Sequence, residues 1–190
     1  VKHVLFSLTL LCIVIAVTFS ACLDNGFVNY DDNIYVINNH RIKSLSPHAV
    51  LNLFLSPQLA NYHPITLLTF AIEFHFFKTN PLPYHATNVC LHIVNCLLIF
   101  WFVYLISKDS TLGILSALLF SIHPIHAEPV AWISCRKVLL CCLFYLGSFI
   151  SYIYYTSRNK PGYYFLTLFL FILAILSRAE AVMLPVLFLG

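Results

Sequence analysis

The chain has 190 residues, of which 61% are hydrophobic and 9% are charged, and its mean hydropathy is +0.88. This composition excludes a soluble globular domain and a disordered chain. The formal net charge of +3 is too small and too scattered to indicate a nucleic-acid partner, and the sequence has no Gly-rich phosphate loop.

Several apolar runs approach the roughly 17–25 residues that a helix needs to cross a hydrocarbon core, so we expect an all-α, polytopic transmembrane bundle of about five to six spans. Residues 4–23 form the first run. A lipoprotein signal is the rival interpretation of this run, because Phe19-Ser20-Ala21-Cys22 resembles a lipobox. The run is long for a signal sequence and Phe19 fits poorly, so we prefer a span.

Residues 24–84 are more polar and are expected to form an outer loop with short amphipathic helices. Ser46-Pro47 is typical of a helix start and leads into His48–Leu55. Pro64 can open a second helix that runs to Phe77 and is closed by Asn80-Pro81. This second helix is apolar but too short to span, so we expect it in the interface or against the bundle.

The later apolar runs predict further spans, separated by the polar turns 108–110 and 157–162. We expect these spans at residues 86–106, 111–125, 129–155 and 163–177, with the start of another at 181–190. Basic residues favour a cytoplasmic location for one end of the bundle: Lys2, Lys108, Arg158 and Lys160. The opposite, non-cytoplasmic face would then combine the 24–84 loop, the block 123–137 and residues 178–180.

The seven cysteines fall in or beside apolar runs without metal-site spacing, which favours small buried hydrophobic side chains. The chain starts at Val1 without a methionine and stops at Gly190 inside an apolar run. We therefore interpret it as a single incomplete transmembrane domain, residues 1–190, of a longer protein.

The block from His123 to Lys137 places charges between apolar runs, where each costs about 2.5–3.5 kcal/mol near a bilayer centre. Such a cost indicates a polar site at the membrane surface. Arg136 and Lys137 suit a phosphate, because arginine offers a bidentate fork and lysine a point charge. A purely structural ion pair, for example with Glu128, is the alternative.

On the second predicted span, His85, Asn88, His92 and Asn95 form one stripe at helical spacing. Lipid cannot satisfy these groups, so the stripe should face the bundle or a wet cavity. Interhelical hydrogen bonding and a substrate-lining role are both consistent with this pattern.

Two further groups could carry chemistry on the same face. The adjacent Asp31 and Asp32 indicate either a turn or a general base at the membrane surface. Arg178 and Glu180 form another charged pair. We disfavour a metal site at His123 and His126, because Pro124 separates them and no third ligand has clear spacing.

Several motifs together resemble one glycosyltransferase family. They are residues 27–32 (Phe-Val-Asn-Tyr-Asp-Asp), 61–64 (Asn-Tyr-His-Pro), 80–88, 123–137 and 176–185. In this order they resemble the first membrane half of the transmembrane O-mannosyltransferases that carry tetratricopeptide repeats, and of their bacterial relatives. The resemblance covers nearly the whole chain.

The resemblance implies a GT-C-type helical bundle that takes a hexose, such as mannose, from a polyprenyl-phosphate donor and gives it to an acceptor hydroxyl. Transfer would be inverting and metal-independent, without a cofactor. By motif, Asp31 or Asp32 matches the general base, and Arg136, Lys137 and Arg178 match positions suited to the donor phosphate. The remaining polar positions are expected to line the substrate: His63, His85, His123, His126, Glu128 and Glu180.

The partners implied are membrane lipid, the lipid-linked sugar and a protein or glycan acceptor, with no nucleic acid. The resemblance favours a bacterial inner membrane with a periplasmic active face over the endoplasmic reticulum membrane. Relatives usually have an acidic residue where this chain has Val138, and the later spans and repeats are missing. A non-catalytic protein of the same fold, which binds lipid phosphate or serves as an assembly subunit, is therefore the alternative.

Overall fold

The structure is a computed structural model that describes residues 2–57 and 61–183, and it is all-α over these residues. The bundle consists of α1 (Lys2–Thr18), α4 (Pro81–Ser107), α5 (Ser110–Ile122), α7 (Arg136–Arg158) and α8 (Pro161–Ser177). The other helices are α2 (Pro47–Leu55), α3 (Pro64–Phe77) and α6 (Ala127–Ala131). Single turns of 3-10 or π-helix join them: η1 (Ser20–Asp24), η2 (Asn33–Ile37), η3 (His40–Ile42), η4 (Pro124–His126), η5 (Ile133–Cys135) and η6 (Ala179–Met183).

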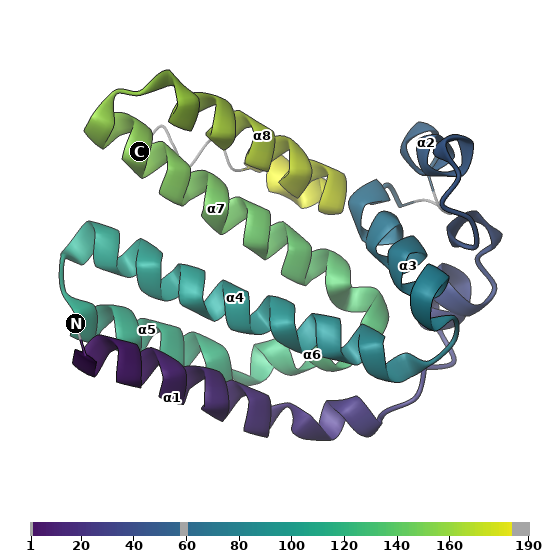
Figure 1. The fold of residues 1–190 in the computed structure, drawn as a ribbon, viewed down its shortest axis with the longest axis horizontal. Coiled ribbons are helices and arrows are strands. Elements are labelled where there is room, and N and C mark those ends of the chain that lie inside the picture. The colour runs from purple at the N-terminus through teal and green to yellow at the C-terminus, as the bar shows by residue number, and fades with distance from the viewer. Residues whose placement is uncertain (1, 58–60, 184–190) are drawn as a thin grey trace.

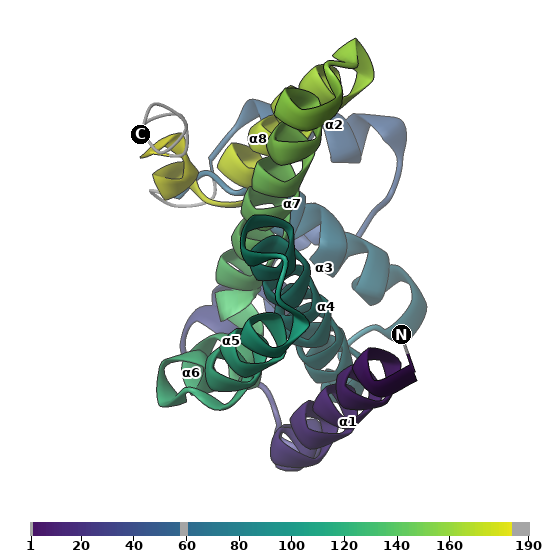
Figure 2. The same ribbon diagram turned by 90° about the vertical axis from the view of Figure 1, so that its left-hand side faces the viewer.

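The five bundle helices run side by side in the order α1, α5, α4, α7 and α8 (Figures 1 and 2). The start of α1 and the α4–α5 and α7–α8 turns lie together at the left-hand end in Figure 1. Helices α2 and α3 gather at the opposite end, which also holds the loop after α1, the α6–α7 connection and the end of α8. The sequence predicted that the 24–84 loop, the block 123–137 and residues 178–180 share one end of the bundle, and this prediction is confirmed.

Two helical segments are long and apolar enough to cross a membrane, Pro81–Ser107 and Ile133–Arg158. A third candidate is the pair Ser110–Ile122 and Pro124–Ala131, if these two helices are counted as one span in spite of a 55° bend. Helices α1 and α8 are apolar but shorter, with 17 residues each. The structure thus shows two or three candidate spans among the described residues and does not show the predicted five to six.

The turns between the helices follow their sequence signals. Lys108 adopts a left-handed conformation, with a φ of 59°, and ends α4. Asp109 then caps α5 by accepting a hydrogen bond of 2.7 Å from the amide of Thr111. Asn159 ends α7 in the same left-handed conformation before Pro161 opens α8. Both polar turns and the two short helices α2 and α3 lie where the sequence predicted them.

Several predicted boundaries were wrong. Helix α4 begins at Pro81 and not at 86, because the side chain of Asn80 caps it. Helix α5 ends at Ile122, where His123 turns the chain into η4. The helix predicted over 129–155 is broken between Ala131 and Arg136. Residues 179–183 form a 3-10 turn, and the rest of the predicted span at 181–190 lies outside the described residues.

Two apolar clusters stabilise this arrangement. One joins α1, α4, α5 and α7 through side chains such as Ile15, Phe100 and Leu139. The other joins the outer segments to the start of α4 and includes Val36, Phe70 and Tyr84. The second cluster fixes the 24–84 loop on the end of the bundle, so that its polar side chains have defined positions.

Candidate functional site

Asp32 links the outer loop to the break between α6 and α7. Its side chain is fully buried. One carboxylate oxygen accepts a hydrogen bond of 2.9 Å from the amide of Ser134 and another from the Ser134 hydroxyl. The second oxygen accepts from the amide of Val28 at 2.9 Å. A buried carboxylate with these donors is well satisfied, so Asp32 fixes the local structure.

Asp31 has a different environment. It is only half-buried, and no other described residue donates a hydrogen bond to its carboxylate. Its oxygens are therefore free to accept a proton from a bound molecule. The structure thus distinguishes Asp31 from Asp32, whereas the sequence left open which of the two is the candidate general base.

Arg136 lies in the interior of the protein and lines none of the three cavities described below. It is fully buried, and its guanidinium forms an ion pair of 2.5 Å with Glu73. It also donates to the side chain of Asn88 at 2.8 Å and to the backbone oxygen of Tyr84 at 2.8 Å. The ring centroid of Phe70 lies 4.6 Å from its central carbon. These contacts occupy the guanidinium, so the structure does not group Arg136 with the other predicted phosphate ligands.

Glu73 was missed by the sequence analysis, although it carried a signal. It is the single carboxylate of the 14-residue apolar helix α3. A charge in such a helix requires a partner when it is buried. Together, Glu73 and Arg136 attach α3 to the start of α7.

Lys137 and Arg178 line a cationic pocket of about 330 Å³ at the junction of α3, α7 and α8. Lys137 lies in the first turn of α7, with its amine 5.6 Å from the ring centroid of Tyr35. Arg178 follows α8, and its Nε lies 3.0 Å from Oε2 of Glu180. The other lining residues are Asn61, Tyr62, His63, Ser177, Ala179 and Glu180.

Two pKa values in this pocket are shifted. Burial lowers the pKa of His63 to about 4, and the positive charges of Lys137 and Arg41 add to this shift. His63 is thus neutral near pH 7, and its ring packs edge-on against Tyr35 with centroids 4.9 Å apart. A hydrogen bond from its own backbone amide, together with Arg178, lowers the pKa of Glu180. The pocket therefore combines two cations, one anion and a neutral imidazole.

The polar stripe of α4 is used mainly for interhelical hydrogen bonds. Asn88 donates to the backbone oxygen of Trp132 at 3.2 Å. His92 contacts the backbone oxygen of Ser121 at 3.0 Å, and Asn95 donates to that of Leu139 at 3.0 Å. His85 is buried, and neither of its ring nitrogens has a hydrogen-bond partner among the described residues.

Two predicted substrate-lining histidines also lie outside the cationic pocket. The ring of His126 packs on Phe120, with centroids 4.1 Å apart. His123 is exposed and caps η4 by accepting from the amide of Ile125 at 3.2 Å. Over residues 2–57 and 61–183, no group of three or more His, Cys, Asp or Glu side chains is placed to hold a metal ion.

A second cavity of about 430 Å³, the aromatic pocket, is lined by the residue that precedes Asp31. Its walls are Asn25, Val28, Tyr30, Glu128, Ala131 and Trp132. The rings of Tyr30 and Trp132 have centroids 6.2 Å apart and are tilted by 44°. The predicted site residue Glu128 belongs to this pocket and not to the cationic one.

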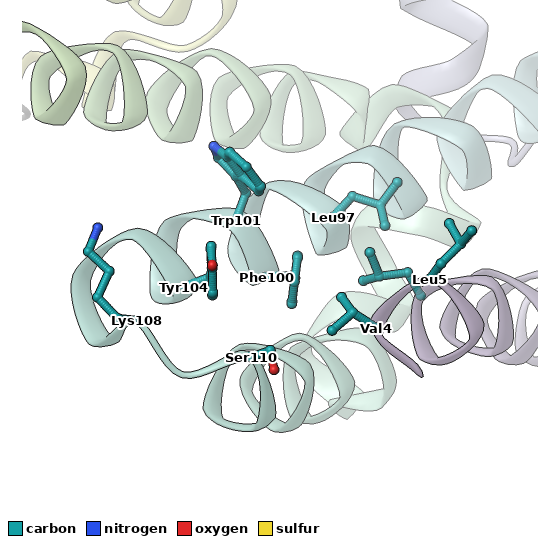
Figure 3. A pocket seen from close by; sticks show the side chains of 9 residues that line it. Val4, Leu5, Leu97, Phe100, Trp101, Tyr104, Lys108 and Ser110 are labelled. Carbon is teal, nitrogen blue, oxygen red and sulfur yellow. The ribbon is translucent and has the colours of Figure 1, made fainter. Parts of the chain in front are cut away.

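A third cavity of about 750 Å³ lies at the opposite end of the bundle, between α1 and α4 (Figure 3). Leu5 and Val4 face Leu97 and Phe100 across it, Lys108 stands at one end, and Ser110 of α5 lies below Phe100 in this view. Its walls are mostly apolar, and it contains none of the predicted site residues.

The fold and the site define a helical membrane protein with a polar site at one end of its bundle. The chain is 32% identical to the protein O-mannosyl-transferase Tmtc1 of Drosophila melanogaster over 172 residues, which cover 84% of the chain and 19% of that protein. It is 31% identical to the human protein O-mannosyl-transferase TMTC4 over 87% of the chain and 26% of that protein. The mouse TMTC4 protein is 29% identical over 95% of the chain and 28% of its own length. No family model matches the chain, and no solved structure matches it.

The chain is therefore a distant homologue of the TMTC protein O-mannosyl-transferases, as its motifs indicated. It spans only between 19% and 28% of the length of the relatives named above. These relatives are animal proteins, so they give no support to a bacterial inner membrane.

Proposed function

We propose that this chain is part of an integral membrane glycosyltransferase. It transfers a mannose-like hexose from a polyprenyl-phosphate donor to a hydroxyl group of a polypeptide, with inversion and without a metal ion. The observation that carries this proposal is a cationic pocket at the same end of the bundle as the loop that carries Asp31 and Asp32, called the acidic loop below. The chain that holds both is homologous to protein O-mannosyl-transferases. The animal relatives favour the endoplasmic reticulum membrane for it.

The proposal includes more membrane spans than the two or three candidates described above. Helices α1 and α8 have 17 residues each and run alongside the longer α4 and α7 (Figure 1). An apolar helix of 17 residues is near the lower limit for crossing a bilayer. We infer that α1 and α8 also cross, that α5 crosses together with η4 and α6, and that the cationic pocket opens at the outer face.

The donor phosphate would bind Lys137 and Arg178. Both side chains line one pocket, and a guanidinium can bind two phosphate oxygens at once. Glu180 already pairs with Arg178, but both side chains are partly exposed, so the pair is weak and can open. The neutral His63 would contribute a hydrogen bond without adding charge.

Asp31 is the better candidate for the general base. As the acceptor oxygen attacks the anomeric carbon, its proton passes to the Asp31 carboxylate. The bond between the anomeric carbon and the phosphate oxygen breaks, and the lipid phosphate leaves with the electron pair. Lys137 and Arg178 stabilise its charge, while Asp32 holds the acidic loop on Ser134.

Replacement of the two cations tests the phosphate site. In membranes that express the full-length protein, Lys137→Met and Arg178→Met should each weaken binding of a polyprenyl-phosphate mannose about tenfold or more, since each removes a charge-assisted contact of roughly 1.5–3 kcal/mol. Lys160→Met, an exposed cation at the opposite end, is the matched control. Unchanged donor binding in both pocket variants would refute this site.

A non-catalytic lipid-phosphate-binding subunit is the second candidate. The ion pair between Arg178 and Glu180 favours it, because an Arg178 held by Glu180 would stabilise a leaving phosphate less, while Lys137 could still bind the lipid phosphate. Donor binding that depends on Lys137, without sugar transfer to any acceptor, would identify such a subunit.

A further inference from the structure

The aromatic pocket and the cationic pocket lie on opposite sides of the acidic loop along the chain. Tyr30 and Trp132 line the aromatic pocket, whereas Tyr35 and Lys137 contact each other at the cationic pocket. Residues 30–35 and residues 132–137 thus both run from the aromatic pocket to the cationic pocket. The hydrogen bond between Asp32 and Ser134 lies between the two cavities.

This order matches what an inverting transfer requires. The attacking hydroxyl must approach the anomeric carbon from the side opposite to the leaving phosphate. If the phosphate lies at Lys137 and Arg178, the acceptor enters from the other side of the acidic loop. The aromatic pocket is a cavity on that side.

The chemistry of this pocket suits a positive charge. Two aromatic rings meet at an angle, and aromatic faces attract cations. Glu128 is exposed at the pocket, and the Sγ of Cys135 lies 3.7 Å from one of its carboxylate oxygens. Asp31 follows Tyr30 directly, and none of the residues that line the pocket in the described part of the chain is cationic.

We infer that the aromatic pocket binds a lysine or arginine side chain of the acceptor polypeptide, close in sequence to the hydroxyl that receives the sugar. This inference rests on the proposed function, because the proposed phosphate site defines the acceptor side. Tyr30 and Trp132 provide the aromatic contact and Glu128 the counter-charge. The pocket thereby selects acceptors by charge.

Synthetic peptides test this selection on the purified full-length protein. We would measure the dissociation constants of three labelled peptides of equal length, with Lys, Gln or Glu two residues from a single serine. The Lys peptide should bind about 3- to 30-fold more tightly than the Gln peptide, in the range of cation–aromatic contacts. The Glu peptide should bind most weakly, and the KM for sugar transfer should follow the same order.

Variants of the pocket complete the test. Glu128→Gln and Trp132→Leu should each abolish most of the preference for lysine. Asp24→Asn, which removes an exposed carboxylate of η1 that does not line the pocket, should retain it. Because Glu128 is exposed, its conservative replacement should not disturb folding.

The outcomes separate this inference from the proposed function. Sugar transfer without a preference for lysine, or with a preference that survives Glu128→Gln, overturns the inference and leaves the proposed function standing. A preference that depends on Glu128, without transfer from any donor, overturns the proposed function and leaves a peptide-binding pocket. Displacement of the peptide by free mannose would identify a sugar site and overturn the inference.

Discussion

Arg136 and Lys137 are adjacent in sequence, but their environments differ. Arg136 points into the protein, where Glu73, Asn88 and a backbone oxygen of Tyr84 satisfy it. Lys137 lies on the wall of the cationic pocket. Because the buried arginine fixes the start of α7, it also fixes where the neighbouring lysine lies.

Loss of the buried partner should be costly. Glu73→Gln leaves a buried guanidinium without its counter-charge, which typically costs about 3–5 kcal/mol. We expect a large fall in the melting temperature of the detergent-purified protein. Glu180→Gln breaks the partly exposed pair with Arg178 and should cost at most about 1 kcal/mol. Equal effects of the two substitutions would contradict a structural role for Glu73.

The burial of His63 predicts a dependence of stability on pH. Its pKa is about 4 in the folded protein, below the ordinary value of 6.5, so the unfolded chain binds a proton first as the pH falls. The stabilisation is fully present above pH 6.5 and is lost as the pH falls towards 4. The melting temperature should therefore decrease over this interval, and His63→Gln should flatten the decrease. The same replacement at the exposed His40 should leave the pH profile unchanged.

At the scale of elements, α4 and α5 pack closely together at Gly113. A Cβ atom at this position would lie 2.9 Å from Cδ2 of Phe100 and 3.1 Å from its backbone oxygen. Gly113→Leu should therefore push the two helices apart and destabilise the protein by about 1–3 kcal/mol. Gly162→Ala, at a site with no atom within 4 Å, is the matched control. Thermal unfolding of the two variants in detergent compares them, and a stable Gly113→Leu protein would contradict this packing.

Local sequence signals predicted most helices. Where these signals missed a helix break, contacts between residues far apart in the chain explain the break. Prolines, caps and polar turns at Ser46, Pro64 and Asp109 gave correct helix starts. The break after Ala131 had no such signal. Asp32 engages the amide of Ser134, and Asn88 donates to the backbone oxygens of Val130 and Trp132, so distant side chains satisfy the interrupted backbone.

The same distinction applies to the site. Spacing alone placed the polar stripe of α4 on one face, and the hydrogen bonds of Asn88, His92 and Asn95 confirm it. The sequence could not show that Arg136 pairs with Glu73, because these residues lie far apart in the chain and meet only after α3 docks. For the same reason it could not separate the environments of Asp31 and Asp32.

On the scale of the whole molecule, the polar groups divide between the two ends of the bundle. The end with the α4–α5 and α7–α8 turns carries exposed basic residues such as Lys108 and Lys160. The other end carries the acidic loop, the cationic pocket and the aromatic pocket. Such a division suits a protein whose helices cross the membrane, with basic residues on one side and the polar site on the other.

Sugar transfer by Asp31 variants tests the central claim most directly. In membranes that express the full-length protein, transfer from polyprenyl-phosphate mannose to a protein acceptor would be measured beside donor binding. Removal of a general base typically costs about 100- to 10,000-fold in rate, so Asp31→Asn should abolish most transfer and retain donor binding. Asp32→Asn should instead lower stability together with activity. Undiminished transfer by Asp31→Asn would contradict the account.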